Sequence, residues 1–93
     1  MDVIKTDEIR QYAKQLDTER SKLVNKCTEC DTLIKQLNQV FNDPAYDRFA
    51  QRYQNYKPTM ESLCQCLEQY VKFLNSVAEN YDEFIRKATS KLQ

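Results

Sequence analysis

The sequence predicts an all-α protein, an antiparallel two-helix hairpin that assembles into a four-helix bundle as a dimer. The 93-residue chain contains no Gly and only two Pro, which disfavours the tight turns of an all-β fold. Gln, Glu, Lys, Leu and Arg, all good helix formers, are plentiful. Two long segments carry apolar residues at alternating spacings of three and four, with one break between them. We therefore expect a single helical-hairpin domain over residues 1–93.

The first helix is expected over about residues 7–41. Thr6 is its predicted N-cap, followed by two acidic residues at the positive end of the helix dipole. Its apolar seam is Ile9, Ala13, Leu16, Leu23, Cys27, Cys30, Ile34, Leu37 and Phe41. Arg20 is the only charge on this seam, and we expect it to face Leu67. Its guanidinium should reach a carboxylate or a phenol at the bundle interface, or extend its charge to solvent.

A turn is expected at about residues 42–44 and a second helix over about 45–90. Asp43 suits an N-cap, and Pro44 suits the first helical position, where no N–H is needed. Pro58 falls inside this helix and should remove one backbone hydrogen bond and bend it. The seam of this helix is Tyr46, Phe49, Tyr53, Tyr56, Met60, Leu63, Leu67, Tyr70, Leu74, Val77, Tyr81, Phe84 and Ala88.

A dimer is expected because two long helices cannot cover their own apolar surface. A helix of about 35 residues is about 50 Å long, whereas a compact globule of this size would be about 25–30 Å across. Outside the seams lie further apolar residues that a second hairpin would cover: Tyr12, Val24, Leu33, Val40, Cys64, Cys66, Phe73 and Ile85. Facing residues of the hairpin should have numbers that sum to about 87, which sets Met60 opposite Cys27.

Composition excludes several classes of function. The chain has no His, the commonest general base and metal ligand, and without Gly it has no phosphate-binding loop. We therefore expect no enzyme, no catalytic residue, no cofactor and no metal. The 14 basic and 14 acidic residues cancel and form no basic stripe, so we expect no nucleic-acid partner. No apolar run is long enough for membrane insertion, and the first twenty residues lack the features of a signal peptide.

Four cysteines form two short motifs, Cys27-x-x-Cys30 and Cys64-x-Cys66. Because Cys64 and Cys66 point in nearly opposite directions on a helix, at most one of them can join the first pair without unwinding. We interpret the thiols as structural residues, with intermolecular disulfides and metal binding as the two alternatives.

The segment around the turn, Phe41-Asn42-Asp43-Pro44-Ala45-Tyr46-Asp47-Arg48-Phe49, resembles the Trp-X-Gly turn of the WXG family of type VII secretion substrates, the early-secreted-antigenic-target group. The resemblance extends over nearly the whole chain, including an Ile-x-x-acid-x-Ile-Arg start at residues 4–10. Here Phe41 stands in place of the Trp and Asp43 in place of the Gly. The residues that match the turn motif are Phe41, Asn42, Asp43, Tyr46 and Phe49.

The resemblance implies a cytoplasmic protein that is then secreted without a cleaved signal peptide. It also implies a homodimer or a heterodimer with a related hairpin, with a larger secreted cargo and the secretion ATPase as further partners. The family's export signal has the form Tyr-x-x-x-Asp/Glu near the C-terminus. Tyr81 lies at the expected place, but Ile85 occupies the acidic position, which makes Tyr81, Asp82 and Glu83 the candidate export-signal region.

Two functional interpretations follow from these features. The first is a secretion substrate, or an escort that pairs with a partner bearing the signal, and the missing acid favours the escort. The second is a generic coiled-coil interaction module unrelated to secretion, for which the heptads alone would suffice. A thiol-based metal or redox protein is a weaker third class.

Overall fold

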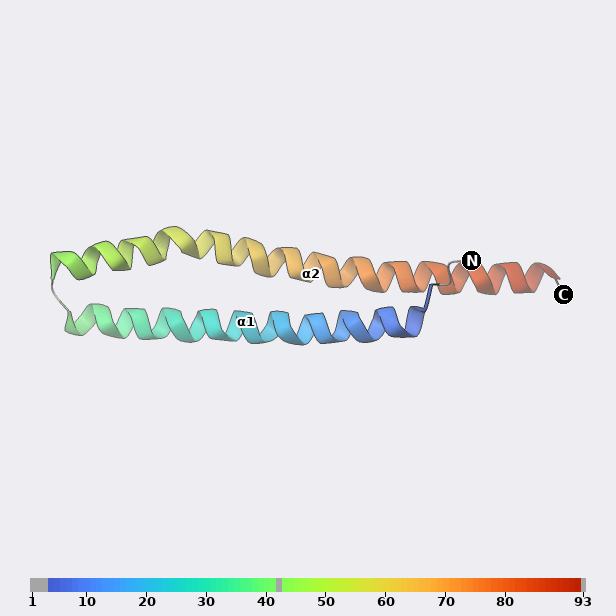
Figure 1. Cartoon of the computed structure of the whole chain (residues 1–93), viewed down its shortest axis with the longest axis horizontal. Coiled ribbons are helices and arrows are strands. Elements are labelled where there is room, and N and C mark those ends of the chain that lie inside the picture. The colour runs from blue at the N-terminus through green and yellow to red at the C-terminus, as the bar shows by residue number, and fades with distance from the viewer. Residues whose placement is uncertain (1–3, 42, 93) are drawn as a thin grey trace.

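The computed structural model describes residues 4–41 and 43–92. Two helices, α1 (Thr6–Val40) and α2 (Pro44–Leu92), run antiparallel and are joined by a short connection (Figure 1). The predicted all-α hairpin is confirmed. Helix α1 ends one residue before its expected boundary, whereas α2 begins one residue earlier and runs two residues further. As a result α2 extends well past the start of α1.

The two helices begin in different ways. Asp43 caps α2 as predicted, because its Oδ1 accepts a 2.7 Å hydrogen bond from the backbone N–H of Ala45. The predicted Thr6 cap of α1 is wrong. Lys5 occupies the N-cap position without a side-chain hydrogen bond, and Thr6 is the first helical residue. Its hydroxyl instead donates to Oδ1 of Asp82 across the hairpin at 2.8 Å, so this side chain joins the helices rather than ending one.

Pro58 lies inside α2 without ending it. Proline has no N–H to donate to the carbonyl of Gln54, and its ring crowds that carbonyl, so the helix must bend to continue. Figure 1 shows α2 bowed away from α1 in its yellow-green stretch, near this residue. The lost backbone bond is therefore accommodated by curvature.

The hairpin is a rod with dimensions of 75 × 19 × 17 Å. Its radius of gyration is 21.5 Å, whereas a compact chain of this length would have about 12 Å. The accessible surface is 8004 Å², compared with about 5,700 Å² for a compact monomer of this mass. Among the described residues only Ala13 and Ala78 are fully buried. One hairpin therefore has almost no core of its own.

Apart from Val77 and Glu83, the half-buried residues of α2 follow a heptad pattern, which marks the face that packs on α1. They are Tyr46, Ala50, Tyr53, Lys57, Met60, Cys64, Leu67, Val71, Leu74, Ala78 and Tyr81, all half-buried except Ala78, which is fully buried. Six of these residues, spaced by seven from Tyr46 to Tyr81, belong to the predicted seam. The others form what we call the inner row: Ala50, Lys57, Cys64, Val71 and Ala78.

The other half of the predicted α2 seam is wrong except at Val77, which is half-buried. Phe49, Tyr56, Leu63, Tyr70 and Phe84, which we call the outer row, are between 51% and 66% exposed. Because the outer row and the inner row differ by one position in the heptad, both border the same central stripe of α2. The helices approach each other over the smaller inner side chains, and this packing leaves the outer row facing away from α1.

The predicted seam of α1 is correct from Ile9 to Cys27, and towards the turn it is correct only at Ile34. Arg20, Leu23 and Cys27 are half-buried as expected, but Cys30 and Leu37 are exposed. Asp31 takes the seam position after Cys27. A polar residue is accepted there because α2 supplies partners for its carboxylate.

Candidate functional site

At the turn, the two aromatic residues that flank it stack on each other. The rings of Phe41 and Tyr46 lie 4.9 Å apart between centroids, with an interplanar angle of 22°. The Tyr46 hydroxyl also donates to the carbonyl of Ile34 at 3.5 Å, which holds the phenol against α1. Phe41 remains 50% exposed, so its ring forms part of the outer surface at this end of the hairpin.

The other turn-motif residues have separate roles. Asp43 is the N-cap of α2, and Asn42 lies outside the described residues. Phe49 is 66% exposed on the outer row, with the Arg52 guanidinium 5.5 Å from the centre of its ring. The structure thus brings together Phe41 and Tyr46 and directs Phe49 outward.

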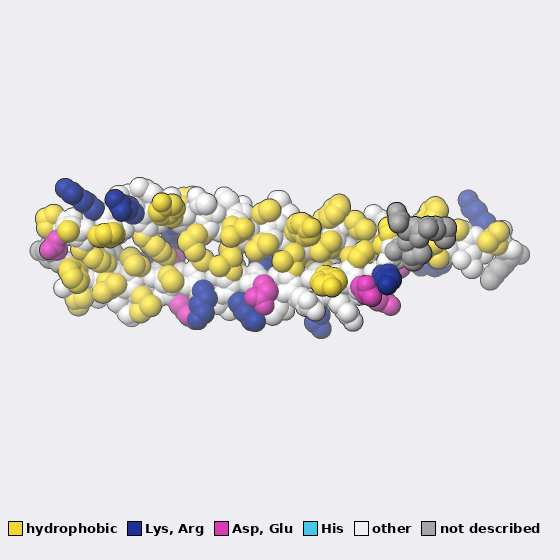
Figure 2. All heavy atoms as spheres, in the orientation of Figure 1, with side chains coloured by type: hydrophobic (Ala, Val, Ile, Leu, Met, Phe, Trp, Pro, Cys, Tyr) yellow, Lys and Arg dark blue, Asp and Glu magenta, His cyan; other side chains and the backbone are white. Residues whose placement is uncertain are grey.

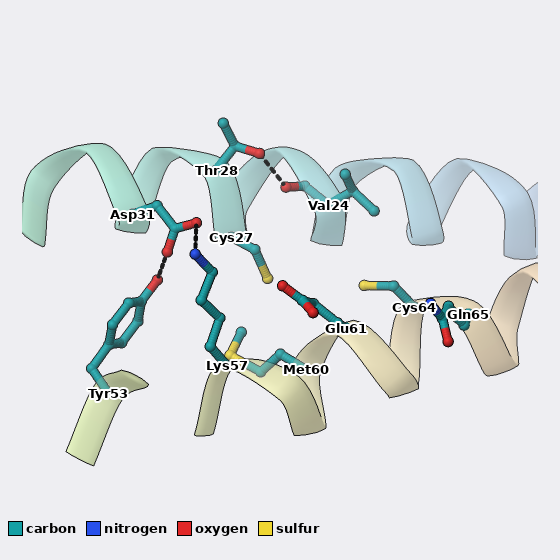
Figure 3. Close-up of a pocket in the computed structure, with 10 residues that line it drawn as sticks. All are labelled: Val24, Cys27, Thr28, Asp31, Tyr53, Lys57, Met60, Glu61, Cys64 and Gln65. Atoms are coloured by element: carbon teal, nitrogen blue, oxygen red, sulfur yellow. Dashed lines mark hydrogen bonds and ion pairs between the residues drawn. The ribbon is translucent and has the colours of Figure 1, made fainter. Parts of the chain in front are cut away.

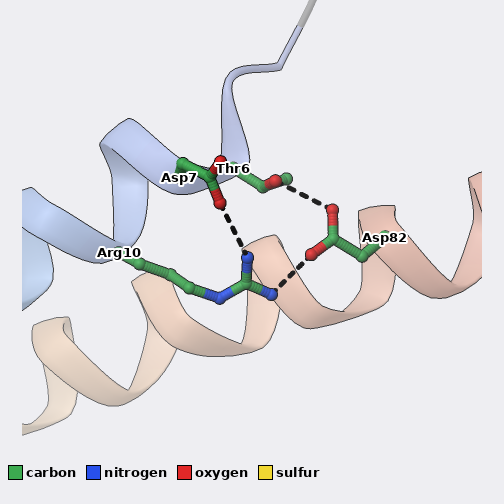
Figure 4. Close-up of polar contacts among 4 residues, drawn as sticks. All are labelled: Thr6, Asp7, Arg10 and Asp82. Atoms are coloured by element: carbon green, nitrogen blue, oxygen red, sulfur yellow. Dashed lines mark hydrogen bonds and ion pairs between the residues drawn. The ribbon is translucent and has the colours of Figure 1, made fainter.

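At the open end, Asp82 joins the two helices. Nη2 of Arg10 donates to Oδ2 of Asp82 at 2.6 Å, and the Thr6 hydroxyl donates to Oδ1 (Figure 4). Arg10 also lies 3.7 Å from Oδ1 of Asp7. The hydrogen bonds from Arg10 and Thr6 hold the pKa of Asp82 below its usual value. Asp82 is therefore engaged within the hairpin.

The neighbours of Asp82 point elsewhere. Glu83 pairs along α2 with Lys87 at 3.2 Å and with Arg86 at 3.9 Å. Tyr81 is half-buried against α1, whereas Ile85, at the position of the family's acid, is 44% exposed. The turn motif and this segment lie at opposite ends of the rod (Figure 1), so one hairpin cannot present them side by side.

Midway along the hairpin lies a polar cluster that the sequence interpretation missed. Asp31 of α1 accepts hydrogen bonds from the Tyr53 hydroxyl and from Nζ of Lys57, the latter at 3.1 Å (Figure 3). These two bonds lower the pKa of Asp31. The same contact, with burial, raises the pKa of Tyr53 to about 12. The helix register could have revealed this pair from the sequence. The residue numbers of Asp31 and Lys57 add up to within one of the sum of about 87 expected for facing residues.

Arg20 reaches a carboxylate on its own helix and not at the bundle interface, where it was expected to do so. Its Nε donates to Oδ1 of Asp17 at 2.8 Å, and its side chain is 25% exposed. This hydrogen bond raises the pKa of Arg20 further above neutrality. The charge therefore stays beside the seam without making an interhelical ion pair.

The surface of the rod shows where binding can occur. Figure 2 shows hydrophobic side chains gathered over both helices and the turn end, with basic and acidic groups scattered between them. The described parts of both helices contain no segment apolar enough to span a membrane. The outer row and the aromatic turn are among the exposed apolar features of the described residues.

Comparison with known proteins agrees with this geometry. The family model described as WXG100, proteins of 100 residues with WXG, matches residues 4–84. The fold is similar to a crystal structure of EsxA from Geobacillus thermodenitrificans, crystal form I, with a TM-score of 0.85 and 20% sequence identity. The match covers 95% of this chain and 98% of that one. Comparison with curated proteins gives no match.

Because the family model covers most of the chain, it disfavours the interpretation as a generic coiled-coil module. Members of this family are small helical proteins that are secreted without a signal peptide, and they form homodimers or heterodimers of helical hairpins. The predicted four-helix bundle is consistent with the family. The hairpin with its aromatic turn and exposed outer row is thus a member of the WXG100 family, the small helical proteins of type VII secretion systems.

Proposed function

We propose that this chain is a non-enzymatic escort of type VII secretion, which pairs with a second hairpin and is exported with it. The observation that carries the proposal is the outer row of α2, whose five large side chains are more than half exposed at multiples of seven residues. A heptad row is the pattern by which one helix packs along another. A second hairpin, either the same chain or a related one, would bury it.

The area of the hairpin supports the same conclusion. The rod exposes roughly 2,300 Å² more than a compact monomer of equal mass would. Obligate dimers bury about 1,000–2,500 Å² on each partner. A second hairpin laid along the outer row would therefore restore the surface of an ordinary folded protein, and the dimer would have the core that the isolated hairpin lacks.

The residues at the open end of the hairpin favour the role of an escort over that of an independently exported substrate. Ile85 stands at the acidic position of the signal, Asp82 is bonded to Arg10 and Thr6, and Glu83 is paired along its own helix. In an antiparallel pair of hairpins, the turn aromatics of one chain would lie beside the C-terminal segment of the other. We propose that the export surface is composite, with Phe41 and Tyr46 from one chain and the acid from its partner.

The mass of the protein in solution tests the pairing. Sedimentation equilibrium at micromolar concentration should give a dimer or a higher oligomer. Poor solubility that is relieved by co-expression with a related hairpin would indicate a heterodimer. A monodisperse monomer that unfolds cooperatively would contradict the proposal.

Secretion of point variants tests the escort role. Tyr81→Phe removes a hydroxyl and Glu83→Gln removes a negative charge. Both variants should leave the bundle intact, which circular dichroism can verify. If the partner supplies the signal, both variants should be secreted at the level of the unmodified chain when the partner is present. Loss of secretion with an intact fold would show that this chain carries a signal of its own.

A further inference from the structure

Helix α1 carries an exposed row of its own, which we call the α1 row: Tyr12, Glu19, Lys26 and Leu33, each seven residues from the next. All four are exposed, and the Tyr12 and Leu33 side chains are large and apolar. Glu19 and Lys26 make only local ion pairs along α1, at 3.3 and 3.2 Å between well-solvated groups. Such pairs exchange at little cost, so this row is available to a partner.

The α1 row lies on the same face of the hairpin as the outer row of α2. Lys57 of the inner row pairs with Asp31, so the inner-row side of α2 and the Asp31 side of α1 form one face. On a helix, the residues one and three positions before a given residue lie on opposite sides of it. Leu33 and Asp31 are related in this way to the half-buried Ile34. The α1 row and the outer row therefore border the opposite face.

The α1 row is complementary to itself when it is reversed. Its order is apolar, acidic, basic, apolar. An antiparallel second copy would set Tyr12 on Leu33 and Glu19 on Lys26, whereas a parallel copy would set Glu19 on Glu19 and Lys26 on Lys26. Opposite charges across an interface favour association, and like charges oppose it. The row therefore favours a second copy that runs antiparallel.

The outer row meets the same condition with apolar side chains. Counting Val77, which stands in line with it, the row has six positions spaced by seven from Phe49 to Phe84. Reversed on itself, it sets Phe49 on Phe84 and Leu63 on Tyr70. The part of α2 that extends past the start of α1 would then lie along the turn end of the other copy.

A single two-fold axis must cross both helices at the same height of the rod. The α1 row is centred between residues 22 and 23, and the outer row is centred between residues 66 and 67. These two midpoints add up to 89. Thr6 and Asp82, which face each other across the hairpin, have numbers that add up to 88. The two rows, centred independently, thus place the axis at one height.

Resting on the proposed pairing of hairpins, we infer that the second hairpin is a second copy of this chain, packed antiparallel with α1 on α1 and α2 on α2. Glu19 of each copy meets Lys26 of the other, and the two outer rows pack together between them and the ends of the rod. The turn of each copy lies beside the C-terminal segment of the other, as the composite export surface requires.

A charge exchange in the full-length chain tests this pairing. Glu19→Lys and Lys26→Glu each place like charges on both sides of the axis and should weaken association about tenfold in sedimentation equilibrium. The double variant E19K/K26E restores both contacts between the copies and should associate as the unmodified chain does. It does not restore the local pairs with Lys22 and Glu29, so the recovery reports the contact between chains.

The matched control for Lys26→Glu is Lys14→Glu. Lys14 is exposed and lies two residues after Tyr12, on the opposite side of α1. The variant makes the same change of charge and should leave association unchanged.

Oxidation with diamide, which joins neighbouring thiols as a disulfide, tests the register. Cys66 is exposed beside the centre of the outer row, so the two copies bring their Cys66 residues to nearly the same height. The two Cys30 residues would lie about 22 Å apart along the rod, which is too far for a disulfide. Cross-linked dimer should therefore form in the unmodified protein and in Cys30→Ser, and it should be lost in Cys66→Ser.

The outcomes separate this inference from the proposed function. In a dimeric protein, absence of the recovery in E19K/K26E or of the Cys66 cross-link would overturn the antiparallel self-pair and leave the pairing of hairpins intact. A dimer that forms only with a related hairpin would do the same. A monodisperse monomer would overturn both.

Discussion

The inner and outer rows of α2 are one position apart in the same heptad, yet the inner row packs on α1 and the outer row remains exposed. The inner row, which includes Ala50, Val71 and the fully buried Ala78, packs on α1. The outer row consists of larger side chains that remain more than half exposed. Small side chains allow two helix backbones to approach closely, whereas large aromatic ones would hold them apart. The comparison indicates that the inner face forms the hairpin, and it supports our proposal that the outer face forms the dimer.

The largest expected effect comes from placing a charge on the outer row. Leu63→Glu should weaken dimer association by about 3 kcal/mol or more, roughly a hundredfold, because the carboxylate would be buried without a partner. The change should leave the hairpin helical. Sedimentation equilibrium measures the dissociation constant, and circular dichroism measures the helix content.

The control for this variant is Gln69→Glu, which adds the same carboxylate at an exposed position on the opposite side of α2. It should leave association unchanged. If both variants dissociate equally, the effect is one of net charge, and the outer row is not the dimer interface.

Enlarging an inner-row residue should instead destabilise the hairpin. Ala78→Leu inserts three carbon atoms at a fully buried contact and should cost about 1–3 kcal/mol of unfolding free energy. Ala88→Leu makes the same change where α2 is exposed and should cost less than about 0.5 kcal/mol. Denaturant unfolding of the two variants gives the comparison, and equal midpoints would show that the inner row is not tightly packed.

The central polar cluster should make stability depend on pH at both extremes. The pKa of Asp31 is lowered in the folded chain, so its contribution is present above its unfolded pKa of about 3.9 and is lost as the pH falls through the lower folded value. The pKa of Tyr53 is raised to about 12, so its contribution is present below its unfolded pKa of about 10 and is lost as the pH rises towards 12.

Two variants separate these contributions. Asp31→Asn should flatten the loss of thermal midpoint in acid, and Tyr53→Phe should flatten the loss in alkali. Tyr12→Phe, which changes a 67% exposed tyrosine, serves as the control for the alkaline arm. An alkaline profile that is the same for Tyr53→Phe and Tyr12→Phe would mean that the Asp31 contact does not couple to folding.

The smallest effect on stability is expected at Arg20. Its ion pair with Asp17 is local to α1 and partly solvated, and such pairs add little stability. Arg20→Leu should leave the unfolding midpoint equal or slightly higher while it loosens the choice of partner, because a charge beside the seam disfavours apolar neighbours. Pull-down against several related hairpins measures partner choice. A large fall in midpoint would show that Arg20 stabilises the hairpin.

The candidate site was only partly predictable. The heptads and the short turn were sufficient to predict which ends of the helices meet, and the register was correct to within one residue at Asp31 and Lys57. The missed contacts are polar, such as Arg10 with Asp82. Sequence periodicity identifies apolar positions, but it does not show when a charged side chain will reach across to the facing helix.

The sequence by itself determined the helices and their order. An absence of Gly, two long 3–4 repeats with Arg20 as the only charge on them, and an Asp-Pro pair at the break leave a helical hairpin as the simplest solution. Only the tertiary structure decided which side of α2 faces α1. Three adjacent rows on one helix, apolar at every position except Lys57, satisfy the heptad equally well. Close packing of backbones selects the smaller row for the hairpin, and it leaves the aromatic row for a partner.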